Sequence, residues 1–161
     1  MKPIESRLLK GRFRAGLLGL ALACAMPPAT IGPSALVRVV DAGLELRARV
    51  DTGAEASSLH ARDVRILGAR VRFVVEGEDG ERIALERPLH DVARVRSAAG
   101  EELRPRVRLR LALAGIEKEI PVSLRDRSAM DYRLLVGRDF LAGDFLVDVS
   151  RGGPAPPAAD R

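Results

Sequence analysis

The chain of 161 residues has the length of one domain with short tails, and 47% of its residues are apolar, which is enough for a hydrophobic core. Only 3% are aromatic, so this core must be built from leucine, valine, isoleucine and alanine. The net charge of +5 suggests a nucleic-acid partner, but +4 of it comes from six N-terminal residues, namely Lys2, Glu5, Arg7, Lys10, Arg12 and Arg14. The rest of the chain has no basic stripe interleaved with aromatic residues, which argues against nucleic acid.

The first 25 residues have the pattern of a signal peptide. A basic segment over residues 1–14 precedes an uninterrupted run of Ala, Gly and Leu from Ala15 to Ala23. This run is too short to span a bilayer comfortably. The following Cys24-Ala25 completes an Ala-x-Ala pattern and predicts cleavage after Ala25. The pattern therefore predicts an exported protein, periplasmic or otherwise outside the cytoplasm.

Lipidation of Cys24 is the alternative to cleavage. A membrane partner is expected for the mature protein only if Cys24 is lipidated. Leu22 stands where a bacterial lipobox prefers a small residue, so the sequence favours cleavage. An uncleaved anchor or an unstructured N-terminal tail is a third interpretation. Cleavage would remove the only cysteine, and a mature chain without cysteine suits an oxidising compartment.

Composition divides the remaining chain into three parts. Residues 26–34 are predicted to be a linker, and residues 35–150 a single domain. Residues 151–161, rich in Gly, Pro and Ala, are predicted to be a disordered tail. The chain has no internal repeat, so the domain is not a pair of duplicated lobes.

Alternation of apolar and polar residues with a period of two predicts strands throughout the domain. In chain order, the predicted strands cover residues 44–50, 71–75, 83–85, 107–113, 116–124, 132–136 and 145–149. The Glu76-Gly77-Glu78-Asp79-Gly80 sequence predicts a hairpin turn. Helical signal is limited to a turn near 57–63 and a short helix at 138–142. The sequence therefore predicts an all-β barrel of about eight short strands.

Two short segments stand out at the ends of predicted strands. Asp51-Thr52-Gly53-Ala54 ends the first strand, and Leu135-Val136-Gly137-Arg138 follows late in the domain. An isolated Asp-Thr-Gly is also an ordinary turn, because Asp and Gly are both turn residues. The order of the two segments, with a hairpin between them and a short helix after them, gives the triplet more weight.

This order resembles the retropepsin family of aspartic peptidases over about residues 40–150. More closely, the chain is similar to the bacterial retropepsin-like proteins once labelled ATP-dependent zinc proteases. The similar stretches are residues 48–54, 57–61, 124–130, 134–141 and 145–151. The resemblance implies a single closed β-barrel with a flap hairpin and one short C-terminal helix. It also implies an aspartic endopeptidase that acts on peptide or protein substrates.

The chemistry of such a peptidase needs two carboxyl groups that share one proton, one to activate water and one to polarise the carbonyl. One chain supplies only Asp51, so the resemblance implies a homodimer whose two-fold axis supplies the second. The Thr52 hydroxyl would join the two loops across the axis. Gly53 would let the backbones approach closely, and Ala54 would complete the loop.

The second segment would support this loop from below. The resemblance implies that Leu135 and Val136 pack beneath it and that Gly137 lets the chain cross it. Arg138 is predicted to pair with Glu55, the alternative being two solvated surface charges.

The hairpin turn containing Gly77 and Gly80 would form the tip of the flap that covers the substrate. Its acidic residues would favour a basic peptide, or would only keep an exposed hairpin soluble. These residues are Glu76, Glu78, Asp79 and Glu81.

No metal or cofactor is predicted. His60 and His90 stand apart, whereas a catalytic zinc site needs about three protein ligands, and the chain has no phosphate-binding loop for ATP. His60 is predicted to be a hydrogen-bonded residue beside the site. Two alternatives to an active peptidase are a non-catalytic peptide-binding module of the same fold and a partner of an envelope peptide-ligase or transglutaminase-like system.

Overall fold

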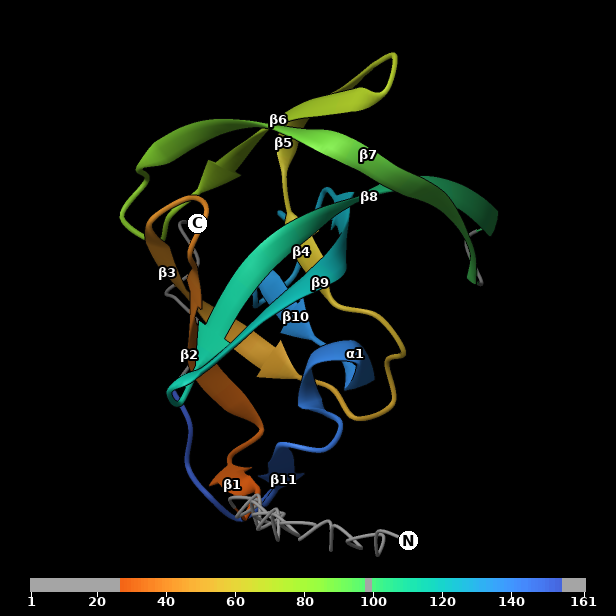
Figure 1. The fold of residues 1–161 in the computed structure, drawn as a ribbon. Coiled ribbons are helices and arrows are strands. Elements are labelled where there is room, and N and C mark those ends of the chain that lie inside the picture. Colours follow the sequence, from red (N-terminus) through yellow and green to blue (C-terminus); the bar gives the residue numbers. More distant parts are fainter. Residues whose placement is uncertain (1–26, 98–99, 155–161) are drawn as a thin grey trace, which may run out of the picture.

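The computed structural model describes residues 27–97 and 100–154. The predicted signal peptide with Cys24, and residues 155–161 of the predicted tail, lie outside the described residues. Within them, eleven strands and one short helix follow one another along the chain (Figure 1). The strands are β1 (Ala29–Ile31), β2 (Ser34–Val39), β3 (Leu44–Val50), β4 (Ser58–His60), β5 (Arg62–Leu67), β6 (Arg70–Glu76), β7 (Arg82–Ser97), β8 (Gly100–Leu113), β9 (Ile116–Arg125), β10 (Leu134–Val136) and β11 (Phe145–Val147), and the helix is α1 (Arg138–Leu141).

Six of the strands close a barrel. They are hydrogen-bonded in the order β2-β3-β10-β4-β9-β8, and β8 pairs again with β2 at Arg38–Ala112 and Val39–Leu111. Because the ring of backbone hydrogen bonds is complete, these strands leave no free edge there. The predicted all-β fold with a closed barrel is confirmed.

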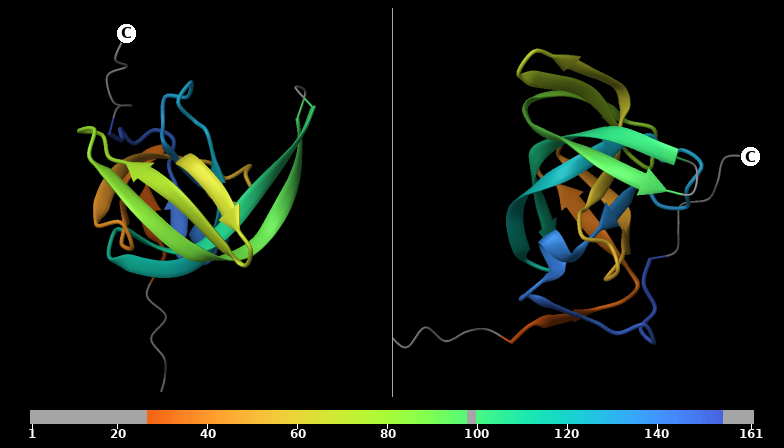
Figure 2. Two further views of the ribbon diagram at one scale, coloured as in Figure 1. Left: turned by 90° about the horizontal axis from the view of Figure 1, so that it is seen from above. Right: turned by 90° about the vertical axis from the view of Figure 1, so that its right-hand side faces the viewer.

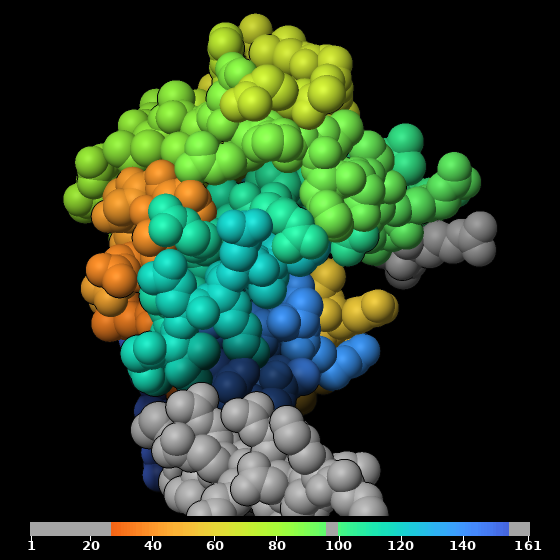
Figure 3. Space-filling model, in the orientation of Figure 1, coloured from red at the N-terminus to blue at the C-terminus, as the bar shows by residue number. Residues whose placement is uncertain are grey.

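The remaining strands of the large sheet extend beyond β8. In the order β7-β6-β5 they form a layer across the top of the barrel in the view of Figure 1. Figure 2 shows the long β7–β8 hairpin reaching out from this layer to one side, and Figure 3 shows it projecting beyond the barrel surface. The molecule therefore has a compact barrel and one protruding hairpin.

The alternating strands bury one face inside the barrel. In β3, Leu44, Leu46, Ala48 and Val50 are buried while Glu45 and Arg49 are exposed, as the period of two requires. Fully burying a side chain of this size contributes about 1.5–3 kcal/mol to folding. The C-terminal helix joins this core through aromatic stacking with β11, because the ring centroids of Phe140 and Phe145 lie 5.6 Å apart.

The segment near 57–63 is not the helical turn that its sequence predicts. Residues 58–60 form β4, which pairs in parallel with β9 and antiparallel with β10. Residues 62–67 form β5, which pairs with β6. Pairing with distant strands outweighs the weak local preference for a helix. The short helix predicted at 138–142 is present as α1.

The predicted linker and tail are partly built into the domain. β1 lies within the predicted linker and pairs in parallel with β11, which buries Ile31. The Ser34 hydroxyl donates to the Pro154 carbonyl at 2.7 Å, and Arg151 donates to the Thr30 carbonyl at 2.9 Å. The domain therefore begins before residue 35 and continues past residue 150. No helix in the described part of the chain is long and apolar enough to cross a membrane.

Candidate active site

The position of Asp51 is set by three strands. β10 lies between β3 and β4, the two strands that the Asp51 loop connects. The Asp51 N–H donates to the Val136 carbonyl at 3.0 Å, which continues the β3–β10 ladder by one residue. Val136 is fully buried, so the loop begins at a fixed point above the barrel core.

The Asp51 carboxylate is oriented by its own loop. Oδ1 accepts the Gly53 N–H at 3.0 Å and the Ala54 N–H at 3.1 Å. Within the described residues, Oδ2 has no hydrogen bond or ion pair. The side chain is half-buried and its two donors are neutral. One carboxylate oxygen is therefore held in place while the other is available for chemistry.

Gly137 lies where the second segment crosses this loop. A Cβ at Gly137 would come within 2.9 Å of the Ala56 carbonyl carbon and 3.0 Å of the Ala54 carbonyl oxygen. Real Cβ atoms do not approach backbone so closely, so only glycine fits here. On either side of this contact, the Arg138 N–H donates to the Ala54 carbonyl and the Asp139 N–H to the Glu55 carbonyl.

Arg138 holds the Asp51 loop by bonding to the backbone of that loop rather than to Glu55. Its Nη1 donates to the carbonyls of Gly53 at 2.7 Å and Thr52 at 3.2 Å. The described residues contain no ion pair between Arg138 and Glu55, so the predicted pair is not formed in this chain. Glu55 instead lines a cavity of about 350 Å³ together with Arg106 and Arg138. Both bonds are made by the same nitrogen, Nη1, which two successive carbonyls of the loop share.

A serine and an aspartate form a brace that the sequence alone did not reveal. The Ser57 hydroxyl donates to Asp139 Oδ1 at 2.7 Å and accepts the Gly137 N–H at 3.0 Å. The Ser57 N–H donates to Asp139 Oδ2 at 2.9 Å. Ser57 is completely buried. Both residues lie within the stretches that resemble retropepsins, and an acidic residue in the first turn of α1 was the available signal.

The Gly77–Gly80 turn is not placed to cover Asp51 in its own chain. A Cβ on Gly77 would lie 3.5 Å from Leu44, and Glu78 accepts the Arg47 N–H at 2.6 Å. Leu44 is at the start of β3 and Asp51 follows its end, about 20 Å away along an extended strand. Figure 1 shows this turn and the Asp51 loop on opposite sides of the molecule. Strand-to-strand packing therefore places the turn at the far end of β3 from Asp51, and the flap role of Gly77 and Gly80 stays a prediction.

Two of the four acidic residues of this turn, Glu76 and Glu78, are partners of arginines in the fold. Glu76 is buried and pairs with Arg62 at 3.0 Å, Arg133 at 3.3 Å and Arg82 at 3.6 Å. Burial by itself would raise the pKa of Glu76, but these arginines outweigh it and lower the pKa. The charges of Glu76 and Glu78 therefore stabilise the turn, whereas Asp79 and Glu81 are exposed.

A buried arginine lies close enough to Asp51 for their charges to interact. Arg127 is only 6% exposed, and its Nε donates to the Tyr132 carbonyl at 3.1 Å. Burial lowers the pKa of Arg127 to about 10, with help from Arg125 and Arg104, while the Asp51 carboxylate acts in the opposite direction. Arg127 is thus charged at neutral pH, and it has no carboxylate in an ion pair among the described residues.

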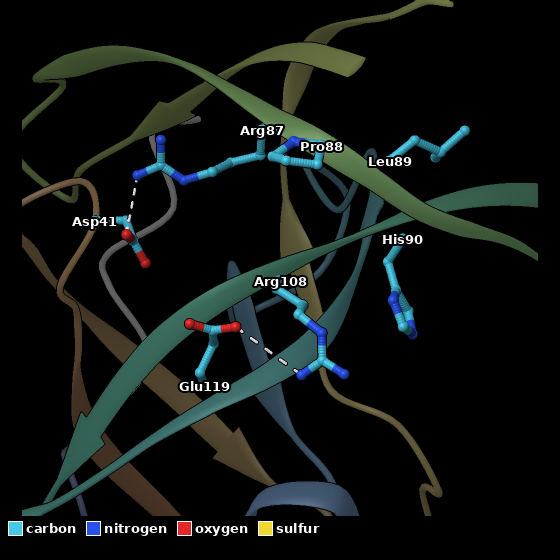
Figure 4. Close-up of a pocket in the computed structure, with 7 residues that line it drawn as sticks. All are labelled: Asp41, Arg87, Pro88, Leu89, His90, Arg108 and Glu119. Atoms are coloured by element: carbon cyan, nitrogen blue, oxygen red, sulfur yellow. Dashed lines mark hydrogen bonds and ion pairs between the residues drawn. The ribbon is translucent and has the colours of Figure 1, made fainter. Parts of the chain in front are cut away.

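The two histidines occupy separate places. His60 accepts the Arg127 N–H through Nδ1 at 2.9 Å, as a hydrogen-bonded residue near the site. His90 faces a cavity of about 340 Å³ that also includes the Asp41–Arg87 and Arg108–Glu119 ion pairs (Figure 4). Asp41 lies just before β3, at the opposite end of that strand from Asp51. Across the described residues, no three His, Cys, Asp or Glu side chains are grouped to hold a metal ion.

Comparisons with solved structures support the fold. A protein of unknown function (DUF785) from Legionella pneumophila superposes with a TM-score of 0.67 and 26% sequence identity. The match covers 79% of this chain and 98% of the Legionella chain.

Two similar curated proteins are both named probable alpha-L-glutamate ligase. The protein from Parasynechococcus marenigrum is 36% identical over 111 residues, which cover 64% of this chain and 24% of that protein. The protein from Shewanella pealeana is 33% identical over 119 residues, which cover 65% of this chain and 25% of that protein. This chain therefore spans about a quarter of the length of the curated relatives that it matches.

A family model covers most of the chain. The model described as RimB-like, retropepsin-like aspartic endopeptidase RimB, matches residues 31–154, which include the Asp51 loop, β10 and α1. This range also agrees with the domain limits in the structure, where β1 and Pro154 are both packed against the barrel. The chain belongs to the RimB-like family of retropepsin-like aspartic endopeptidases.

Proposed function

We propose that this protein is an aspartic endopeptidase in which Asp51 from each of two subunits forms the catalytic pair. The observation that carries the proposal is the Asp51 carboxylate, which two backbone N–H groups orient while its second oxygen is left without a partner in the described residues. In a member of an aspartic endopeptidase family, such a carboxylate is the expected reactive group. A two-fold axis would supply the second one.

The catalytic loop supports the homodimer. Thr52 and Gly53 are exposed, and the Thr52 hydroxyl has no hydrogen-bond partner within the described part of the chain. A Cβ on Gly53 would meet only its own Asp51 Oδ1, at 3.3 Å. The single chain therefore has no strong need for glycine at residue 53, whereas a second loop packed against it would need one.

Hydrolysis in this proposal needs no covalent intermediate. One Asp51 of the pair is ionised and takes a proton from the attacking water, while the protonated Asp51 gives its proton to the carbonyl oxygen. The tetrahedral intermediate then collapses as the amide nitrogen takes up a proton from the pair and one of the two hydroxyl groups on the carbon returns a proton to the pair, which restores the shared proton. The two carboxyls titrate as one system, so the pH dependence belongs to the pair.

Glutamate-rich peptides are the substrates that we propose. Two relatives carry names that refer to glutamate ligation. Arg104 and Arg125 both act on the charge of Arg127, which in turn interacts with Asp51. Arg127 is buried and Arg104 is paired with Glu102 at 2.6 Å, so an acidic chain would be attracted mainly by Arg125, and the basic peptides expected from an acidic flap would not.

We also propose that the protein acts outside the cytoplasm after removal of residues 1–25, which lie outside the described residues. Mass spectrometry of the mature protein decides between the alternatives. An N-terminus at Met26 supports cleavage, and a lipid on Cys24 supports the lipoprotein alternative.

A second candidate function is a non-catalytic peptide-binding module that works with a ligase. The relatives named as ligases favour it, because this chain matches only 24% and 25% of their lengths and neither name refers to a peptidase. Such a module would bind glutamate-rich peptides without cleaving them.

The test uses residues 26–161 and a peptide library that contains glutamate-rich, neutral and basic members, with cleavage measured against pH. We expect cleavage of acidic peptides, and Asp51→Asn should reduce it about a thousandfold or more. Activity that survives Asp51→Asn contradicts the mechanism. Tight binding of acidic peptides without cleavage by the unmodified protein supports the binding module.

A further inference from the structure

His60 is a buried histidine whose hydrogen bond defines its protonation state. It ends β4, is 4% exposed, and its backbone N–H donates to the Arg133 carbonyl at 2.6 Å. Its ring Nδ1 accepts the Arg127 backbone N–H at 2.9 Å. A nitrogen that accepts a hydrogen bond carries no proton, so this bond assigns a neutral ring with its proton on Nε2.

The partner of this hydrogen bond is Arg127, the buried arginine whose charge interacts with that of Asp51. Arg127 is held at its backbone by His60 and at its guanidinium by the Tyr132 carbonyl. It is buried, it has no carboxylate in an ion pair among the described residues, and its charge interacts with that of Asp51. The segment from Asp126 to Arg133, which has no regular strand or helix, otherwise lies exposed over much of its length. The His60 bond is thus one of the few that fix Arg127.

We propose that neutral His60 is a positioning residue for Arg127, and that protonation of His60 releases the Arg127 backbone from this hydrogen bond and so changes the position of its charge. A proton on Nδ1 turns the acceptor into a donor, so that two N–H groups face each other and the bond to Arg127 is lost. Asp126 Oδ1 lies 3.4 Å from Nδ1 and would accept the new N–H. The effect on catalysis rests on the proposed peptidase function, whereas the release of Arg127 does not.

The groups that face His60 determine the pH at which its ring is protonated. Burial is the largest influence and lowers the pKa of His60 below its usual value of 6.5. Arg133 and Arg62 lower it further, whereas Asp126 and Glu76 act in the opposite direction. The ring is therefore neutral at pH 7 and is protonated only in more acidic solution than an ordinary histidine. A protein outside the cytoplasm can meet such pH values.

The direct test follows His60 and Arg127 in the full chain by NMR between pH 7.5 and pH 4 (about the range in which a histidine titrates). We expect the ring nitrogens of His60 to report a neutral Nε2–H form at pH 7. The Arg127 amide signal should then shift with the same midpoint as the ring. An Arg127 amide that does not respond when His60 titrates overturns the proposal, and this measurement needs no variant.

Two variants separate positioning from simple structural support. In His60→Asn, the side-chain Oδ1 can replace Nδ1 as an acceptor that does not titrate, so the Arg127 amide should keep its pH 7 position in acid. His60→Leu removes the acceptor and should give the displaced signal at every pH. A pH-dependent Arg127 shift of unchanged size in His60→Asn overturns the proposal.

Activity provides a second, independent readout. The ratio of kcat/KM for His60→Asn to that of the unmodified protein should rise about tenfold as the pH falls through the His60 titration, because only the unmodified protein loses Arg127. Superimposable pH profiles overturn the catalytic part of the proposal. If the chain cleaves no peptide, the peptidase function fails, and the amide titration still decides whether His60 positions Arg127.

Discussion

Strand β3 has acidic residues near both of its ends, and they are held in different ways. Near Leu44, Asp41 bonds Arg87 at 2.9 Å, and Glu76 is surrounded by arginines. Burial would raise the pKa of Asp41, but the Arg110 N–H and the Arg87 guanidinium outweigh it and lower the pKa. After Val50, Asp51 accepts only two backbone N–H groups.

This contrast separates structural charge from reactive charge. The carboxylates near the start of β3 have guanidinium partners, so their charge is used in joining the upper layer to the barrel. The carboxylate after the end of β3 is oriented without a bonded cation, and one of its oxygens has no partner among the described residues. The first group should therefore affect stability, and the second should affect activity.

Among changes that leave both Asp51 carboxylates in place, Gly53→Ala should reduce activity most. The new Cβ meets only Asp51 Oδ1 at 3.3 Å in the single chain, so the folded monomer should be nearly as stable as before. Close approach of two loops across the axis should be blocked, with a loss of cleavage of about a hundredfold or more. Sedimentation at several concentrations and peptide cleavage measure the two effects. An active, fully dimeric Gly53→Ala protein would show that the loops do not pack together.

Gly137→Ala should instead destabilise the fold. Its Cβ would lie 2.9 Å from the backbone of Ala56, and such overpacking costs about 1–3 kcal/mol. Urea unfolding measures the loss, and Gly152→Ala is the matched control because nothing lies within 4 Å of a Cβ there. Equal stabilities for the two variants would contradict the crossing described at Gly137.

Ser57→Ala should remove the brace between the catalytic loop and α1. The change removes two hydrogen bonds of the Ser57 hydroxyl, one to Asp139 Oδ1 and one from the Gly137 N–H. The loss should lower the free energy of unfolding by about 1–2 kcal/mol. Ser150→Ala is a useful control, since its hydroxyl also bonds an aspartate but at an exposed site. The brace is unimportant if both variants unfold at the same urea concentration.

The smallest expected effect concerns stability in acid. Because the folded-state pKa of Glu76 lies below its unfolded value of 4.5, the unfolded chain takes up the proton first as the pH falls. The stability from this group is present above pH 4.5 and is lost as the pH falls toward the folded pKa. Glu76→Gln should flatten this part of the profile and lower stability at pH 7 by about 1–2 kcal/mol. Glu81→Gln, in the same turn but exposed, should leave the profile unchanged.

Local sequence patterns predict many of the strands and turns, but they say less about how these elements pack in space. Leu44 to Val50 alternate clearly, and Gly77 and Gly80 do form a turn between paired strands. The location of that turn beside Leu44 depends on how β6 and β7 pack over the barrel, and a local sequence pattern contains no such information. The extra strand β1 was missed because its short segment gains stability only by pairing with β11.

The candidate site shows the same limit. Asp51 and Gly137 could be identified from their motifs, because both depend on local backbone geometry. The Arg138–Glu55 pair expected from the sequence is not formed, since the choice between a carboxylate and two carbonyl oxygens depends on the path of the loop. Arg127 lies in a stretch that resembles the family, but its burial and the interaction of its charge with Asp51 follow from the three-dimensional fold.

Whether two copies of Asp51 act together can be measured by mixing subunits. Unmodified and Asp51→Asn chains are combined at a constant total concentration, allowed to exchange, and assayed for peptide cleavage. If both carboxylates are required, activity follows the square of the unmodified fraction, so an equal mixture has about a quarter of full activity. Activity that falls in direct proportion, to about half at the same point, would show that each chain works alone and would contradict the shared site.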